Sequence, residues 1–115
     1  MPQRASHRVD WSESWGRYQI KTIQGRITRW RGITLDTWEW FAWLQEIPSF
    51  HFQAKDNGHF TARKETRKRG GVYWIAYRHS GGQLLKKYIG PQAQVTMSRL
   101  EEVADELERK ARPEA

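Results

Sequence analysis

Apolar and polar positions change their spacing several times along the chain, and each change marks a predicted element. Two short runs of β-forming residues, 18–23 (YQIKTI) and 27–30 (ITRW), flank Gln24-Gly25. A Gly-containing turn between two such runs is typical of a β-hairpin. We therefore expect a hairpin near the N-terminus, preceded by a flexible leader over residues 1–10.

The next segment, ITLDTWEWFAWLQEIP, has helical spacing. Its apolar residues recur at intervals of three and four, at Trp40, Trp43, Leu44 and Ile47. Asp36 followed by Glu39 is a capping-box pattern, and Pro48 ends the segment. The spacing predicts a helix over 37–46 whose tryptophans belong to the core rather than to a ligand cage.

From Phe50 onward the spacing becomes two, which is typical of strands. Turn signals at Asn57-Gly58, Gly70-Gly71 and Gly81-Gly82 separate four predicted strands, at residues 50–53, 59–67, 72–79 and 83–89. In the second of these strands Phe60 and Ala62 point to one face. The opposite face receives Thr61, Arg63, Glu65 and Arg67.

A last amphipathic helix starts at Thr96 or Ser98, with Ser98 and Glu101 as a capping box, and runs to about Lys110. Its apolar stripe is Leu100, Val103, Ala104 and Leu107. The predicted class is α+β: an antiparallel three- to four-stranded β-meander covered by this helix, with an N-terminal β-hairpin plus helix. We expect one domain over 11–110 and a flexible tail over 111–115.

The charge of the chain is concentrated in one segment. The formal net charge is +7, yet residues 59–90 alone carry eight Lys and Arg against one acid, while residues 1–58 sum to +2 and residues 91–115 to −2. The seven tryptophans indicate a folded chain, because disordered chains are poor in aromatic rings. A folded basic domain favours polyanionic partners, namely DNA, RNA or an anionic membrane surface.

Signatures of an enzyme or a metalloprotein are missing from the sequence. Cysteine is absent, which excludes disulfides, thiolate zinc sites and cysteine nucleophiles. The four histidines show no metal-ligand spacing, and neither a GxSxG elbow nor a Walker A loop is present. No apolar stretch could span a membrane or serve as a secretory signal. We expect a cytoplasmic protein with no catalytic site, metal or cofactor and no membrane partner.

Basic and aromatic residues interleave along the strands of residues 59–90, and this pattern favours double-stranded DNA. A twisted antiparallel ribbon fits the major groove, where arginine pairs bidentately with guanine. The candidates for base edges are Arg63, Arg67 and Arg78. The candidates for phosphates are Lys68, Arg69, Lys86 and Lys87. Lys64, Trp74 and Tyr88 complete the predicted DNA-binding set.

Several points stay open at the level of sequence. Glu65 can accept a hydrogen bond from cytosine or form a structural ion pair within its strand. A one-residue change of register decides whether Tyr73 or Trp74 faces outward. Acids on the last helix, Asp105, Glu106 and Glu108, are explained by a solvated face.

Two other functions fit the same composition. Single-stranded DNA or RNA can stack on sheet aromatics such as Tyr73, Trp74 or Tyr88. A protein partner can dock on the tryptophan-rich N-terminal half, through Trp11, Trp15, Trp30 or Trp38. Dependence on the cations of 59–90 and on salt separates DNA binding from protein docking.

The stretch HFTARKETRKRGGVYWIAYRHSGGQLLKKYIGPQAQVTMSRLEEVADEL resembles the N-terminal domain of large MalT-like (LuxR-type) transcriptional regulators of Chloroflexi-like bacteria. There an RKE…RGG-YW-AYR…KRYLG…T-RLE pattern precedes an ATPase module. The matching residues are Arg63, Lys64, Glu65, Gly70, Gly71, Tyr73, Trp74, Ala76, Tyr77, Arg78, Lys87, Tyr88, Gly90, Thr96, Arg99, Leu100 and Glu101.

This resemblance extends from about Trp11 to Leu107 and implies a bacterial regulatory context. No ATPase module and no helix-turn-helix follows here, so we expect the domain to stand alone. The order of strands and helix is also similar to the arm-site DNA-binding domains of tyrosine integrases and to the AP2 domain. In both, the sheet enters the major groove, which implies transcription regulation or another role at the nucleoid.

Overall fold

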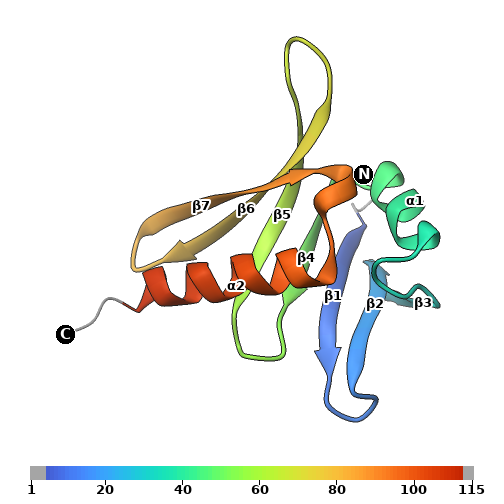
Figure 1. Ribbon diagram of the computed structural model, residues 1–115. Coiled ribbons are helices and arrows are strands. Elements are labelled where there is room, and N and C mark those ends of the chain that lie inside the picture. Colours follow the sequence, from blue (N-terminus) through green and yellow to red (C-terminus); the bar gives the residue numbers. More distant parts are fainter. Residues whose placement is uncertain (1–4, 113–115) are drawn as a thin grey trace.

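Seven strands form one mixed sheet in the computed structural model, which describes residues 5–112 (Figure 1). The strands are β1 (Ser6–Ser12), β2 (Arg17–Gln24), β3 (Ile27–Arg31), β4 (Ser49–Gln53), β5 (His59–Thr66), β6 (Val72–Ser80) and β7 (Gln83–Pro91). Their order is β3-β2-β1-β4-β5-β6-β7. Neighbours are antiparallel except β1 and β4, which run parallel. The class is α+β, as predicted.

Strand β1 lies where the sequence predicts a flexible leader. It is a central strand that pairs with both β2 and β4, and Val9 in its middle is completely buried. The leader prediction over 1–10 is therefore wrong from Ser6 onward, while residues 1–4 lie outside the described part. Because β1 joins the N-terminal hairpin to the C-terminal meander, the predicted meander of three to four strands is one part of a larger sheet.

Both main helices, α1 (Trp38–Glu46) and α2 (Met97–Ala111), pack against the same face of the sheet (Figure 1). Phe50 on β4 contacts Trp40 and Trp43 of α1, with ring centroids 5.7 Å and 6.3 Å away. Phe52, on the same face, contacts Tyr18, whose hydroxyl donates a hydrogen bond to Glu101 of α2. The predicted place of the helical tryptophans in the core is confirmed.

The cap of α1 differs from the predicted one, whereas the cap of α2 is one of the two predicted starts. Thr37 caps α1 and accepts from the backbone N–H of Trp40. Asp36, the predicted cap, has φ of 67° and accepts from the backbone N–H of Met97 at the start of α2. Thr96, the earlier of the two predicted starts, caps α2. A short 3-10 helix, η1 (Gln92–Gln94), joins β7 to α2.

The other face of the sheet carries no helix within residues 5–112, and we call it the open face. On β6, Trp74 and Ala76 are fully buried under the helices, so Tyr73, Ile75 and Tyr77 lie on the open face. This answers the question of register left open by the sequence. Helix α2 ends at Ala111, close to the predicted boundary, and none of the described helices is long and apolar enough to cross a membrane.

Candidate nucleic-acid interface

The predicted DNA-binding residues divide between the two faces of the sheet. Six lie on the open face or in the loop between β5 and β6: Arg63, Arg67, Lys68, Arg69, Lys86 and Tyr88. Four lie on the side of the helices: Lys64, Trp74, Arg78 and Lys87. The structure therefore brings together only part of the predicted set.

The loop between β5 and β6 projects beyond the neighbouring strands, as Figure 1 shows in yellow. The backbone N–H of Arg67 donates to the carbonyl of Gly71 at 3.2 Å and closes the turn. Gly70 and Gly71 both have φ of 83°, a conformation that glycine adopts without strain. Lys68 and Arg69 are exposed at the tip. The loop thus holds Lys68 and Arg69 away from the body of the sheet, next to Arg67 at its base.

Arg67 lies over two tyrosine rings on the open face. Its guanidinium carbon is 4.7 Å from the ring centroid of Tyr73 and 5.8 Å from that of Tyr88, and Nη2 donates to the Tyr88 hydroxyl at 3.5 Å. Lys86, on β7, has its Nζ 5.5 Å from the centroid of Tyr77. Such contacts orient the side chains of both cations. The N–H donors that make no hydrogen bond to the protein stay free to bind water or a ligand.

Glu65 has two hydrogen-bond donors within the sheet. The hydroxyls of Tyr77 and Tyr73 donate to its carboxylate at 2.5 Å and 3.3 Å. The hydrogen bond to Glu65 raises the pKa of Tyr77 above its usual range. Of the two roles that the sequence left open, the structural one therefore fits, but it acts through tyrosines, and Glu65 forms no ion pair with any residue of 5–112.

The cations on the covered side are occupied by protein groups. Arg78 Nη2 lies 2.8 Å from Glu108 of α2, and both side chains are largely buried, at 12% and 17% exposure. Lys87 Nζ lies 2.8 Å from Glu106. These pairs correct two predictions at once, because Lys87 and the Nη2 group of Arg78 are engaged by acids of α2 rather than exposed, and the two acids do not form a solvated face.

Lys64 and Trp74 were also predicted to bind DNA, and both lie on the side of the helices. Trp74 is fully buried in the core, so it cannot contact a nucleic acid. Lys64 Nζ donates to the Gln45 carbonyl at 3.0 Å and lies 5.5 Å from the centroid of Trp74. Burial lowers the pKa of Lys64. Both residues follow the alternation of β5 and β6, which directs them toward the helices.

A second basic region, which was not predicted, lies at the other edge of the sheet. Residues 17–31 contain five cations and no acid, which the sum over residues 1–58 conceals. All five residues of β3 are exposed, including Trp30, whose ring lies 5.2 Å from Lys21 Nζ. A count over shorter windows would have revealed this region.

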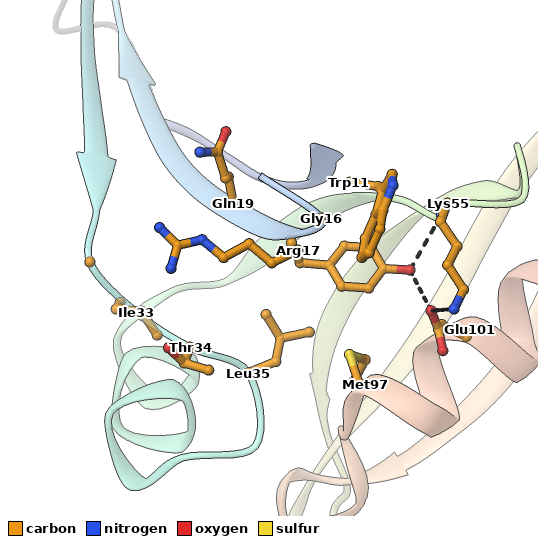
Figure 2. Close-up of a pocket in the computed structure, with 12 residues that line it drawn as sticks. Trp11, Gly16, Arg17, Gln19, Ile33, Thr34, Leu35, Lys55, Met97 and Glu101 are labelled. Atoms are coloured by element: carbon orange, nitrogen blue, oxygen red, sulfur yellow. Dashed lines mark hydrogen bonds and ion pairs between the residues drawn. The ribbon is translucent and has the colours of Figure 1, made fainter. Parts of the chain in front are cut away.

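A pocket of about 460 Å³ lies on the helix side, between β2, the loop before α1 and the start of α2. Figure 2 shows Trp11, Leu35 and Met97 around it, with Lys55 and Glu101 at one end. The Tyr18 hydroxyl donates to Glu101 at 2.7 Å, and burial, followed by this hydrogen bond, raises the pKa of Tyr18. Lys55 Nζ lies 3.8 Å from the same carboxylate. Tyr18, Glu101 and Lys55 thus satisfy one another at this end of the pocket.

Comparison of the chain with protein-family models, with curated proteins and with solved structures finds no match. Among residues 5–112, no three acidic or histidine side chains come together in a way that could hold a metal ion. The strongest chemical feature is therefore the group of cations on the open face and the projecting loop.

Proposed function

We propose that the protein binds double-stranded DNA through the open face of β5–β7 and the loop over residues 67–71. The observation that carries the proposal is the contrast in pairing. Within the described residues no ion pair involves the cations of this surface, namely Arg63, Arg67, Lys68, Arg69 and Lys86, whereas Arg78 and Lys87 on the covered side are paired. Clustered, unpaired cations favour a polyanion.

The shape of this surface supports a duplex over other polyanions. A two-stranded antiparallel ribbon is narrow enough to enter the major groove, and the ends of β5 and β6 that extend beyond their pairing with β4 and β7 form, with their loop, a short projection of this kind with a basic tip. In this arrangement Arg63 is the candidate for a base edge, while Lys68, Arg69 and Lys86 contact phosphates. A role in transcription regulation at the nucleoid follows as part of the same proposal.

A titration with nucleic acids tests the proposal. Random duplex DNA, single-stranded DNA and RNA are each titrated at several salt concentrations, with fluorescence anisotropy of the labelled nucleic acid as readout. We expect duplex to bind most tightly, with log K falling by about 0.9 per phosphate contact for each unit of log salt. Tighter binding of single-stranded DNA or RNA than of duplex would mean that the ligand is a single strand stacked on the aromatic rings. No binding of any nucleic acid at low salt would overturn the proposal.

Docking of a protein partner is a second candidate, and the exposed tryptophans favour it. Trp15, Trp30 and Trp38 are 67%, 62% and 77% exposed, although such rings usually find cover. Trp11, the fourth candidate, packs against Tyr18 with ring centroids 5.0 Å apart. A partner of this kind would bind with little dependence on salt and would be lost in Trp30→Ala, whereas DNA binding would survive that change.

A further inference from the structure

A second hollow, of about 490 Å³, opens where β5 and β6 diverge. The two strands pair only as far as Thr61 and Tyr77, and beyond them β6 and β7 continue as a separate ribbon (Figure 1). Three imidazoles and two guanidiniums line the hollow, from His51, His59, His79, Arg63 and Arg78. Three hydroxyl-bearing side chains join them, and no carboxylate belongs to the lining within the described residues. Beside the apolar Phe60 and Leu84, every polar side chain of the lining can therefore donate a hydrogen bond.

Two of the imidazoles form a pair. The rings of His51 and His59 lie on neighbouring strands with centroids 5.7 Å apart. Burial lowers the pKa of both, and the charges of Arg8 and the partner imidazole lower that of His51 further, against the opposite effect of Asp10. Around His59, the charges of Arg78 and Arg8 act in the same direction, and Glu108 opposes them.

Arg78 adds donors that the protein leaves unused. Its Nη2 is held by Glu108, but Nε and Nη1 are buried without a hydrogen-bond partner in the described residues. A buried donor without a partner loses free energy relative to water, so a ligand that accepts from it is favoured. A tetrahedral oxyanion has enough acceptor oxygens for guanidinium, imidazole and hydroxyl donors together.

We propose that this hollow is a phosphate-binding site, which takes one backbone phosphate of the bound duplex and binds it more tightly as His51 and His59 become protonated. This inference deepens the proposed function and rests on it for the source of the phosphate. An anion reverses the local balance, because each proton taken up then meets a negative charge as well as two arginines. Affinity for phosphate should therefore rise as the pH falls below neutrality.

The first test uses inorganic phosphate and no DNA. The histidine ring signals of the intact protein are followed by NMR from pH 5 to 8, in phosphate and in chloride at equal ionic strength. We expect phosphate to raise the pKa of His51 and His59 by about half a unit or more. His7, which is bonded to Thr22 under the helices, is the internal control. Equal displacement of all four histidines, or none, would overturn the site.

The second test uses duplex DNA at pH 7.5 and 5.5 and constant salt. We expect roughly tenfold tighter binding at the lower pH for the natural protein. The double variant His51→Gln/His59→Gln should lose this pH dependence. The matched control Lys86→Gln should bind more weakly at both values and keep the dependence, because lysine does not titrate in this range.

The two tests separate the possible sources of phosphate and the two proposals. Phosphate binding combined with pH-independent DNA binding would assign the hollow to free phosphate and overturn its place in the DNA interface. Phosphate binding with no DNA binding at all would overturn the proposed function, while the phosphate site itself would stand. Failure of the double variant to fold would not block the decision, since the NMR test uses the natural sequence.

Discussion

The cations on the two faces of β5–β7 differ in whether they form ion pairs. On the covered face Arg78 and Lys87 are tied to Glu108 and Glu106 of α2, whereas on the open face Arg63 is exposed and without an ion pair among the described residues. In the sequence, the basic segment and the acidic segment are separate. In the fold, α2 neutralises one side of the sheet, so the other side carries the charge that a partner can meet.

The largest effect that would test this contrast is on stability. Arg78→Ala leaves Glu108, which is 17% exposed, with the exposed Arg112 as its remaining ion-pair partner. Breaking a mostly buried pair in this way should lower the free energy of unfolding by about 3 kcal/mol. Arg63→Ala, on the open face, should change it by less than about 0.5 kcal/mol. Urea denaturation measures both, and equal losses would contradict the assignment of the two faces.

The next effect concerns binding to DNA. Removing the three loop cations, Arg67, Lys68 and Arg69, by alanine should weaken duplex binding roughly 30-fold at 0.1 M salt. The slope of log K against log salt should become shallower by about 1.8, at about 0.9 for each of the two phosphate contacts assigned to Lys68 and Arg69. Stability should change little, because Lys68 and Arg69 are exposed.

A matched variant at the other basic edge sharpens this comparison. Arg26, Arg29 and Arg31 are also three exposed cations, and their replacement by alanine removes the same charge. We expect a smaller loss of affinity than for the loop variant. A larger loss would move the interface from the β5–β6 loop to the hairpin of β2 and β3.

A smaller effect distinguishes buried from exposed tyrosines. The pKa of Tyr18 is raised, so its hydroxyl stabilises the fold below the usual tyrosine pKa of about 10, and this contribution is lost as the pH rises further. Tyr18→Phe should cost about 1 kcal/mol at pH 7 and reduce the decline of stability between pH 9 and 11. Tyr88→Phe, on the open face, should leave the free energy of unfolding at pH 7 unchanged. Thermal unfolding of the two variants between pH 7 and 11 measures these effects. Identical dependence of stability on pH in both variants would contradict the assigned role of Tyr18.

The sequence predicted most elements of the fold, because their patterns are local. The hairpin, both helices and the four strands after Phe50 lie close to their predicted bounds. Strand β1 was missed because SHRVDWS buries only Val9 completely, and its place depends on parallel pairing with β4, about 40 residues away. A strand that is central by virtue of its partners need not look apolar on its own.

The candidate site was only partly predicted, because local patterns identify the face of some side chains and not of others. On β5 the alternation of buried Phe60 and Ala62 correctly directs Arg63 to the open face. On β6 both faces carry aromatic or aliphatic side chains, so the pattern cannot identify the covered one. The turn at Gly81-Gly82 sets the faces of β7 as far as Tyr88, and a register shift beside Trp74 changes the pairing of its last residues. The acid that engages Arg78 is 30 residues away in sequence.

The smallest effect is also the most direct comparison, because Lys86 and Lys87 are adjacent in sequence and lie on opposite faces. Lys86→Ala should weaken duplex binding about threefold without changing stability, since it removes one exposed cation. Lys87→Ala should leave affinity unchanged and lower the free energy of unfolding by at most about 0.5 kcal/mol, because its pair with Glu106 is one-third exposed.

Anisotropy titration and urea denaturation of these two variants measure both quantities. Each lysine differs from its neighbour only in the face that the pleat gives it, so net charge is the same in the two variants. Equal losses of affinity would mean that DNA responds to total charge and not to a defined surface. A greater loss for Lys87→Ala would place the nucleic acid on the side of α2, where it would have to displace Glu106.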